Sequence, residues 1–209
     1  MNHKPLQVYT NKQPAEIAIS VETSDSQIWL EFLRGSDQAF GAIYREYVNK
    51  LFTYGRQFTK NENLVLDTIQ DVFFTLIKDR ANLGVAVSIK FYLFASFRRR
   101  LVQNLKKQKK FVLSDDLSNN ESFTISSGPH QIFVNPVLDD HQKKIIEESC
   151  NKLSTRQREA LMLHYFEELS YKEVAEIMQL SHIKSARNII YKALDSLSKL
   201  LTPLKKELS

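Results

Sequence analysis

The chain has 209 residues, 43% of them hydrophobic, and its formal net charge of +5 gives a pI of about 9.2. It can bury one core of useful size or two small ones, and its basic balance favours a polyanionic partner. We expect a cytoplasmic protein, because no stretch approaches the roughly 18 apolar residues of a membrane span, the first residues lack a signal-peptide core, and the single Cys150 excludes an internal disulfide. Five glycines and five prolines leave little turn chemistry for hairpins, so we expect an all-α fold.

Charge divides the chain into two small helical domains joined by a flexible linker. Residues 81–114 contain no Asp or Glu but many Lys and Arg, whereas residues 111–142 contain no Lys or Arg. Much of the second stretch is rich in Ser and Asn and has no helical period, as is typical of a linker. We predict a flexible tail at 1–24, a helical module at 25–110, the linker at 111–139 and a second helical module at 140–209.

The N-terminal module begins with two predicted helices. Gly35 follows an apolar stretch and is a candidate C-cap for the first helix. Ser36 or Asp37 then caps a second helix, whose apolar and aromatic positions run to Tyr54.

The next predicted helix, in the stretch 61–80, carries two stripes at helical spacing. The first is apolar and faces the core. The second combines acidic, amide and aromatic side chains. A solvated acidic face is the alternative, but Phe74 amid polar groups indicates a binding face. The core stripe is Val65, Ile69, Val72, Phe73 and Leu76, and the outer stripe is Asp67, Gln70, Asp71 and Phe74.

Residues 88–110 predict a basic helix with a core seam at every fourth residue. Cations and aromatic rings surround the seam, a mixture that suits single-stranded nucleic acid, because bases stack on rings while Lys and Arg follow phosphates. The alternative is that the rings belong to the core and the charges only solvate the helix end. The seam is Ile89, Leu93, Phe97 and Leu101, and the surrounding set is Lys90, Phe91, Tyr92, Phe94, Arg98, Arg99 and Arg100.

The C-terminal module predicts a helix-turn-helix. Capping boxes at 154–157 and 170–173 start two helices, and a break around residues 179–182 precedes a long helix. That last helix has an apolar stripe and a polar stripe. The polar stripe can reach base edges and phosphates in a major groove, although an exposed face of any helical bundle would look the same. The apolar stripe is Ile183, Ala186, Ile190, Ala193 and Leu194, and the polar stripe is Lys184, Arg187, Asn188 and Tyr191.

These segments together resemble the sigma-70 family of RNA polymerase sigma factors, of the extracytoplasmic-function (ECF) type. "LSTRQREALMLHYFEELSYKEVAEIMQLSHIKSARNIIYKAL" (153–194) resembles region 4. "GSDQAFGAIYREY" (35–47), "DTIQDVFFTLI" (67–77) and "SIKFYLFASFRRRL" (88–101) resemble region 2, in the family's order. The form "KSARNIIYKAL" is similar to factors of the Bacteroidetes group.

The resemblance implies partners and roles. It implies binding to bacterial RNA polymerase core through the β′ clamp helices and the β flap, to promoter DNA, and to an anti-sigma factor. Region 2 would bind the polymerase through Asp67, Gln70, Asp71, Phe73 and Phe74, and the −10 single strand through Lys90, Phe91, Tyr92, Arg98, Arg99 and Arg100. Region 4 would bind the −35 duplex through Ser181, His182, Lys184, Ser185, Arg187, Asn188, Tyr191 and Lys192.

The chain also departs from the family pattern. Gln179 stands in the helix-turn-helix turn where many relatives have Gly. Because a left-handed conformation costs a non-glycine residue on the order of 1 kcal/mol, we expect a differently shaped turn.

Other classes of function fit less well. The five histidines are scattered without metal-ligand spacing, and there is no Gly-rich phosphate loop or G-x-S-x-G elbow, so we expect no catalytic residues, metal or cofactor. The alternatives are a free-standing helix-turn-helix regulator with an N-terminal sensor or dimerisation domain and, more distantly, an RNA- or single-strand-binding protein.

Overall fold

The computed structural model describes residues 25–84, 88–111 and 140–201, and every regular element in these ranges is helical. The all-α prediction is therefore confirmed. The predicted tail at 1–24 and linker at 111–139 lie outside the described residues, apart from Phe111, where α4 ends. None of the described helices is long and apolar enough to cross a membrane. The N-terminal elements are α1 (Asp25–Leu33), α2 (Asp37–Gly55), α3 (Glu62–Lys78), the 3₁₀ turn η1 (Arg80–Asn82) and α4 (Ile89–Phe111). The C-terminal elements are α5 (Asp140–Asn151), α6 (Thr155–Leu161), the π-helical turn η2 (Met162–Phe166), α7 (Tyr171–Ile177) and α8 (Ile183–Leu200).

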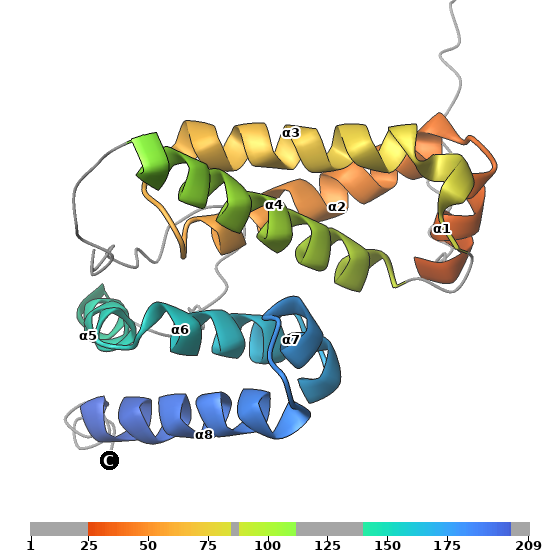
Figure 1. Ribbon diagram of the computed structural model, residues 1–209. Helices are drawn as coiled ribbons and strands as arrows, with labels where there is room; N and C mark the ends of the chain where they lie inside the picture. The colour runs from red at the N-terminus through yellow and green to blue at the C-terminus, as the bar shows by residue number, and fades with distance from the viewer. Residues whose placement is uncertain (1–24, 85–87, 112–139, 202–209) are drawn as a thin grey trace, which may run out of the picture.

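The N-terminal module packs α2, α3 and α4 around one core, with α1 closing its end (Figure 1). Gly35 takes the left-handed conformation (φ 100°) that ends α1, as predicted. Of the two candidate caps for α2, Ser36 is the N-cap, and its hydroxyl accepts from the Ala39 N–H at 3.2 Å. The predicted core stripe of α3 and the predicted seam of α4 are buried throughout. The periodicity of the sequence thus located the faces of these helices correctly.

Gly55, the last residue of α2, lets α3 and α4 approach closely. A Cβ at this position would lie 2.6 Å from Cγ1 of Val65 and 2.8 Å from Cζ of Phe97, both of which are buried. We therefore expect Gly55→Ala to lower the free energy of unfolding by about 1–3 kcal/mol in urea titrations, although Ala favours the helix. Gly41→Ala is the matched control. It would meet only the flexible end of Arg45, so equal stability of the two variants would contradict the packing argument.

The C-terminal module is started by the two predicted capping boxes. Ser154 accepts from the Gln157 N–H at 3.3 Å, and the Gln157 side chain accepts from the Ser154 N–H at 2.9 Å. Ser170 and Glu173 repeat the arrangement at the start of α7. The α8 helix packs on α6 and α7 through the middle of its predicted apolar stripe, where Ala186, Ile190 and Ala193 are fully buried. This is the helix-turn-helix arrangement of α7 and α8. The prediction was wrong for the two ends of the stripe, because Ile183 and Leu194 are 45% and 37% exposed.

In the turn between α7 and α8, a non-glycine residue takes the left-handed backbone conformation. Gln179 has φ 54°, the conformation that we expected a non-glycine residue to avoid, so that expectation was wrong. The Leu180 N–H donates to the Ala175 carbonyl at 2.8 Å and the Gln179 N–H to the Glu176 carbonyl at 3.1 Å. These two bonds satisfy two of the carbonyls at the end of α7, those of Ala175 and Glu176, and offset the backbone strain.

Candidate nucleic-acid interface

The outer face of α3 combines an exposed aromatic ring with acidic and amide groups. Phe74 is 69% exposed, although its neighbour Phe73 is only 3% exposed and packs in the core. Asp67, Gln70 and Asp71 are exposed on the same helix. The sequence-predicted set therefore divides, because Phe73 can support this face but presents little surface to a partner. We call Asp67, Gln70, Asp71 and Phe74 the α3 face.

The aromatic rings of the basic helix α4 are more buried than an open stacking surface requires. Phe94, which the sequence placed beside the seam, is fully buried and packs 5.1 Å from the Tyr54 ring, because α4 faces both α2 and α3. Phe91 and Tyr92 are half-buried against the core. The alternative that the rings belong to the core is therefore correct for Phe94.

The three consecutive arginines of α4 point in different directions. Arg99 is exposed. Arg100 donates to the Thr75 hydroxyl at 3.1 Å and pairs with Asp71 at 3.2 Å, which connects α4 to the α3 face. Arg98 instead turns towards the C-terminal module and pairs with Glu159 on α6. Successive helical positions are about 100° apart, so the run does not form one basic patch.

A buried polar network joins the two modules. The Glu159 carboxylate, with a 1% exposed side chain, accepts from the Tyr54 hydroxyl at 2.9 Å and from the Arg98 guanidinium. Burial by itself would lower the pKa of Arg98, but its hydrogen bond and ion pair with Glu159 outweigh this effect and raise the pKa. Burial and the Glu159 charge raise the pKa of Tyr54 well above its usual value. The network therefore consists of an ion pair and a neutral phenol.

A second contact between the modules lies at the turn after η2. The Lys90 ammonium donates to the Glu167 carbonyl at 2.8 Å. The Glu167 side chain is itself buried, and burial raises its pKa against the opposing effect of Lys50 and Lys90. Lys90 and Arg98, both predicted to bind single-stranded DNA, are thus engaged by the C-terminal module in this arrangement.

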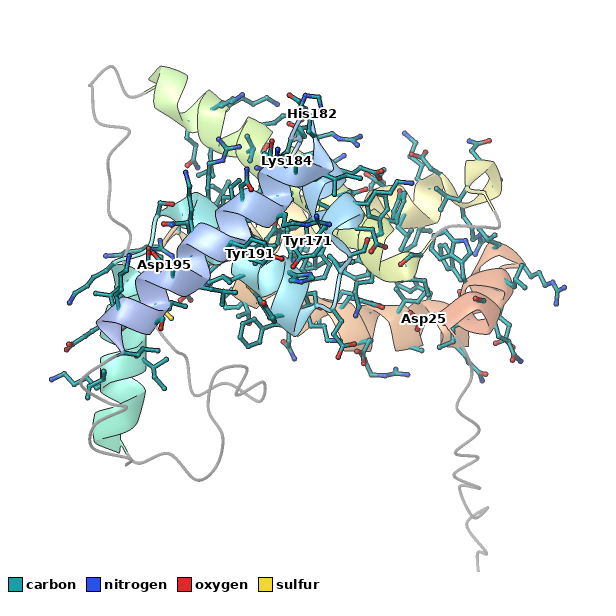
Figure 2. All side chains as sticks on the ribbon, turned by 90° about the horizontal axis from the view of Figure 1, so that it is seen from below. Asp25, Tyr171, His182, Lys184, Tyr191 and Asp195 are labelled. Atoms are coloured by element: carbon teal, nitrogen blue, oxygen red, sulfur yellow. The ribbon has the colours of Figure 1, made fainter. Side chains whose placement is uncertain are left out.

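The polar stripe of α8 is exposed over its length. Lys184, Arg187, Asn188 and Lys192 are all exposed, and Tyr191 is 55% exposed. Figure 2 shows His182 and Lys184 at the start of α8, with Tyr191 midway along it and Asp195 further on. These side chains form one continuous face that a DNA groove could meet.

A surface groove beside this face adds residues that the sequence did not indicate. Asn188 and Lys192 of α8 line it together with Ser181, Ser185 and the turn residue Gln179. Its opposite wall comes from the start of α6 and includes Arg156 and Gln157. Gln157 had been noted only as a capping residue, and no local pattern marks Arg156, because its position depends on the packing of α6 against α8.

Both modules match known protein families. Residues 43–111 match the family described as Sigma-70 region 2, and residues 143–197 match the family described as Sigma-70, region 4. The chain belongs to the sigma-70 family. It is an RNA polymerase sigma factor for transcription initiation, as the sequence motifs predicted. Because the N-terminal module of this sigma factor matches region 2, the alternative of an unrelated sensor or dimerisation domain is not supported.

Relatives agree with this family, and solved structures share its fold. The ECF RNA polymerase sigma factor SigM of Bacillus subtilis (strain 168) is 29% identical over 157 residues, which cover 72% of this sigma factor and 88% of SigM. RNA polymerase sigma factor YlaC of the same strain is 24% identical over 167 residues, covering 79% and 93% of the two chains. The structure of the sigma factor RpoE in complex with the anti-sigma factor NepR from Bartonella quintana has a TM-score of 0.56 at 20% identity. It covers 78% of this sigma factor and 97% of that chain, and at this identity it supports the fold alone. The likeness to Bacteroidetes factors stays a prediction.

Proposed function

We propose that this sigma factor acts through three surfaces, one for the polymerase and two for promoter DNA. The α3 face would bind the β′ clamp helices of the polymerase core. The α4 helix would bind the −10 single strand. Arg99 is exposed for this contact, and Lys90 and Arg98 would join it when the two modules part. The exposed face of α8 would read the −35 duplex, with region 4 also meeting the β flap. One observation carries this proposal. The chain matches region 2 and then region 4, and the predicted binding faces are exposed on α3 of region 2 and on α8 of region 4.

We further propose that the modules extend over 25–110 and 140–209, and that the protein is a cytoplasmic transcription factor without catalytic activity of its own. RNA polymerase would supply the chemistry. Two solved structures with this fold are complexes, one of CnrH with the cytosolic domain of CnrY and the other of the sigma factor RpoE with the anti-sigma factor NepR. This supports an anti-sigma factor as a further partner. Adding the protein to bacterial core polymerase and sequencing the transcripts begun from genomic DNA tests the function directly. Initiation no different from core alone would contradict it.

The α3 face gives a specific prediction for polymerase binding. Replacing Gln70 and Phe74 together by Ala should weaken binding to core by about 2 kcal/mol, roughly thirtyfold, because an exposed aromatic flanked by polar groups is a typical hot spot. Both side chains are exposed, so helical content should not change. Titration of labelled protein with core measures the loss.

The matched control is Gln38→Ala, which removes an exposed glutamine from α2. Its affinity for core should equal that of the unmutated protein. Full core binding by a well-folded Gln70→Ala/Phe74→Ala variant would remove the α3 face from the proposal. Phe73→Ala is a poorer probe, because its buried ring predicts a packing loss of about 3–5 kcal/mol.

A further inference from the structure

We propose that Tyr171, backed by His164, is a positioning residue that holds the Arg187 guanidinium ready to read a base pair. The inference rests on the proposed role of α8 in reading promoter DNA and adds a residue outside the polar stripe. Tyr171 is the first residue of α7, so it belongs to the helix that supports α8. In Figure 2, Tyr171 is labelled near the middle of α8, next to the label of Tyr191.

Three planar groups form a stack at this place. The His164 and Tyr171 rings are stacked, with centroids 4.3 Å apart and planes inclined by 29°. On Tyr171 lies the Arg187 guanidinium, whose Cζ is 5.1 Å from the ring centroid. This distance is within the range of a cation–π interaction. The imidazole, the phenol ring and the guanidinium thus connect η2, α7 and α8.

A hydrogen bond and a ring contact fix the lower part of the stack. His164 Nδ1 lies 2.7 Å from the Leu169 carbonyl oxygen. A carbonyl only accepts, so Nδ1 carries the hydrogen and the orientation of the imidazole is set. The Tyr165 ring packs edge-on against His164 at 4.8 Å. The imidazole on which the Tyr171 ring stacks therefore has a fixed orientation.

The stack suits recognition because of the shape of the guanidinium. Stacking occupies a face of this planar group, whereas its N–H donors lie in the plane at its edge. Arg187 remains exposed, so those donors can still reach the edge of a guanine, which arginine recognises through two parallel hydrogen bonds. A free arginine would have to lose side-chain entropy on binding. A guanidinium already held on Tyr171 has lost part of this entropy before it binds. The entropy cost of binding is therefore smaller, which favours binding to the correct base.

Two substitutions at Tyr171 separate the aromatic platform from simple packing. Tyr171→Leu keeps apolar volume but removes the aromatic face, and Tyr171→Phe keeps the face but removes the hydroxyl group. We would transcribe a library randomised across the −35 region with polymerase carrying each variant, and with Arg187→Ala for reference. Tyr171→Leu should lose preference at the same base pairs as Arg187→Ala, by about three- to tenfold, while Tyr171→Phe should retain it. Loss of packing alone would lower activity on all promoters and leave the preferences unchanged.

The outcomes distinguish this inference from the proposed function. If Arg187→Ala relaxes a base preference and folded Tyr171→Leu does not, or if Tyr171→Phe loses as much as Tyr171→Leu, the positioning role is overturned. If neither Arg187→Ala nor Tyr171→Leu changes any base preference, both the base-reading role proposed for Arg187 and the positioning role of Tyr171 are overturned. NMR of the unmutated protein provides a test that needs no variant to fold. Stacking predicts upfield ring-current shifts of the Arg187 side-chain protons, and random-coil shifts would overturn the stack.

Discussion

Replacement of Glu159 by Ala should separate the two modules and increase the radius of gyration of the free protein. Glu159 is the acceptor for both Tyr54 and Arg98, and its side chain and the Arg98 side chain are 1% and 13% exposed. Removing one member of a buried ion pair leaves the other charge without compensation, at a cost of about 3–5 kcal/mol. Parting of the modules lets Arg98 and Tyr54 return to water and avoids this cost. Small-angle X-ray scattering measures the expansion, and circular dichroism should show unchanged helix.

Two further variants test the assignment to this network. Glu176→Ala removes the same charge from an exposed position of α7 and should keep the compact form. The double variant Glu159→Ala/Arg98→Ala should lose less free energy of unfolding than the sum of the two single variants, because the double variant buries no unpaired charge. If the scattering curve and urea unfolding of Glu159→Ala match those of Glu176→Ala, the network does not hold the modules together.

The contacts between the two modules also affect DNA binding. Lys90 and Arg98 contact the C-terminal module in the compact arrangement, so DNA cannot use them there. If these residues bind the −10 strand as proposed, the modules must part first. Glu159→Ala should then raise the affinity of the free protein for single-stranded DNA, an effect that a fluorescent oligonucleotide would measure.

Most of the fold could be predicted because its signals are local. The stripe of α3 from Val65 to Leu76 and the capping boxes at Ser154 and Ser170 depend only on neighbours within a few residues. Phe94 could not be placed in this way. Its burial requires α4 to face both α2 and α3, and this depends on how the helices assemble.

The candidate sites were predictable as helix faces but not as sets of contacts. The sequence marked Arg98, Arg99 and Arg100 as one basic run, although helical geometry already implies that they diverge. It gave no sign that Arg98 pairs with Glu159, which is 61 residues away along the chain. The sequence also gave no sign of a role for Tyr171, because an aromatic residue directly after a capping serine belongs to no stripe at helical spacing. Its relation to Arg187 arises only when α7 and α8 pack together.

Replacing Arg187 by Ala should change which promoters are used, whereas replacing Lys192 by Ala should weaken all of them. Arg187 lies about one turn inside α8, where a guanidinium can reach base edges, so its loss should cost about 1–3 kcal/mol at one or two upstream base pairs. Lys192 lines the groove with Asn188 and Arg156, where a flexible ammonium suits a phosphate. Its loss should reduce the slope of binding against salt by about one unit, with little change in preference.

Transcription of the −35 library at several salt concentrations compares these two variants directly. Lys199→Ala is the control, because Lys199 is an exposed lysine near the end of α8 that pairs with Asp195 at 2.7 Å. It should match the unmutated protein in both preference and salt slope. Uniform losses of similar size for Arg187→Ala and Lys192→Ala would mean that Arg187 contacts only phosphate. The base-reading residues would then lie elsewhere on the exposed face of α8, with Asn188 and Lys184 the next to test, because they share that face.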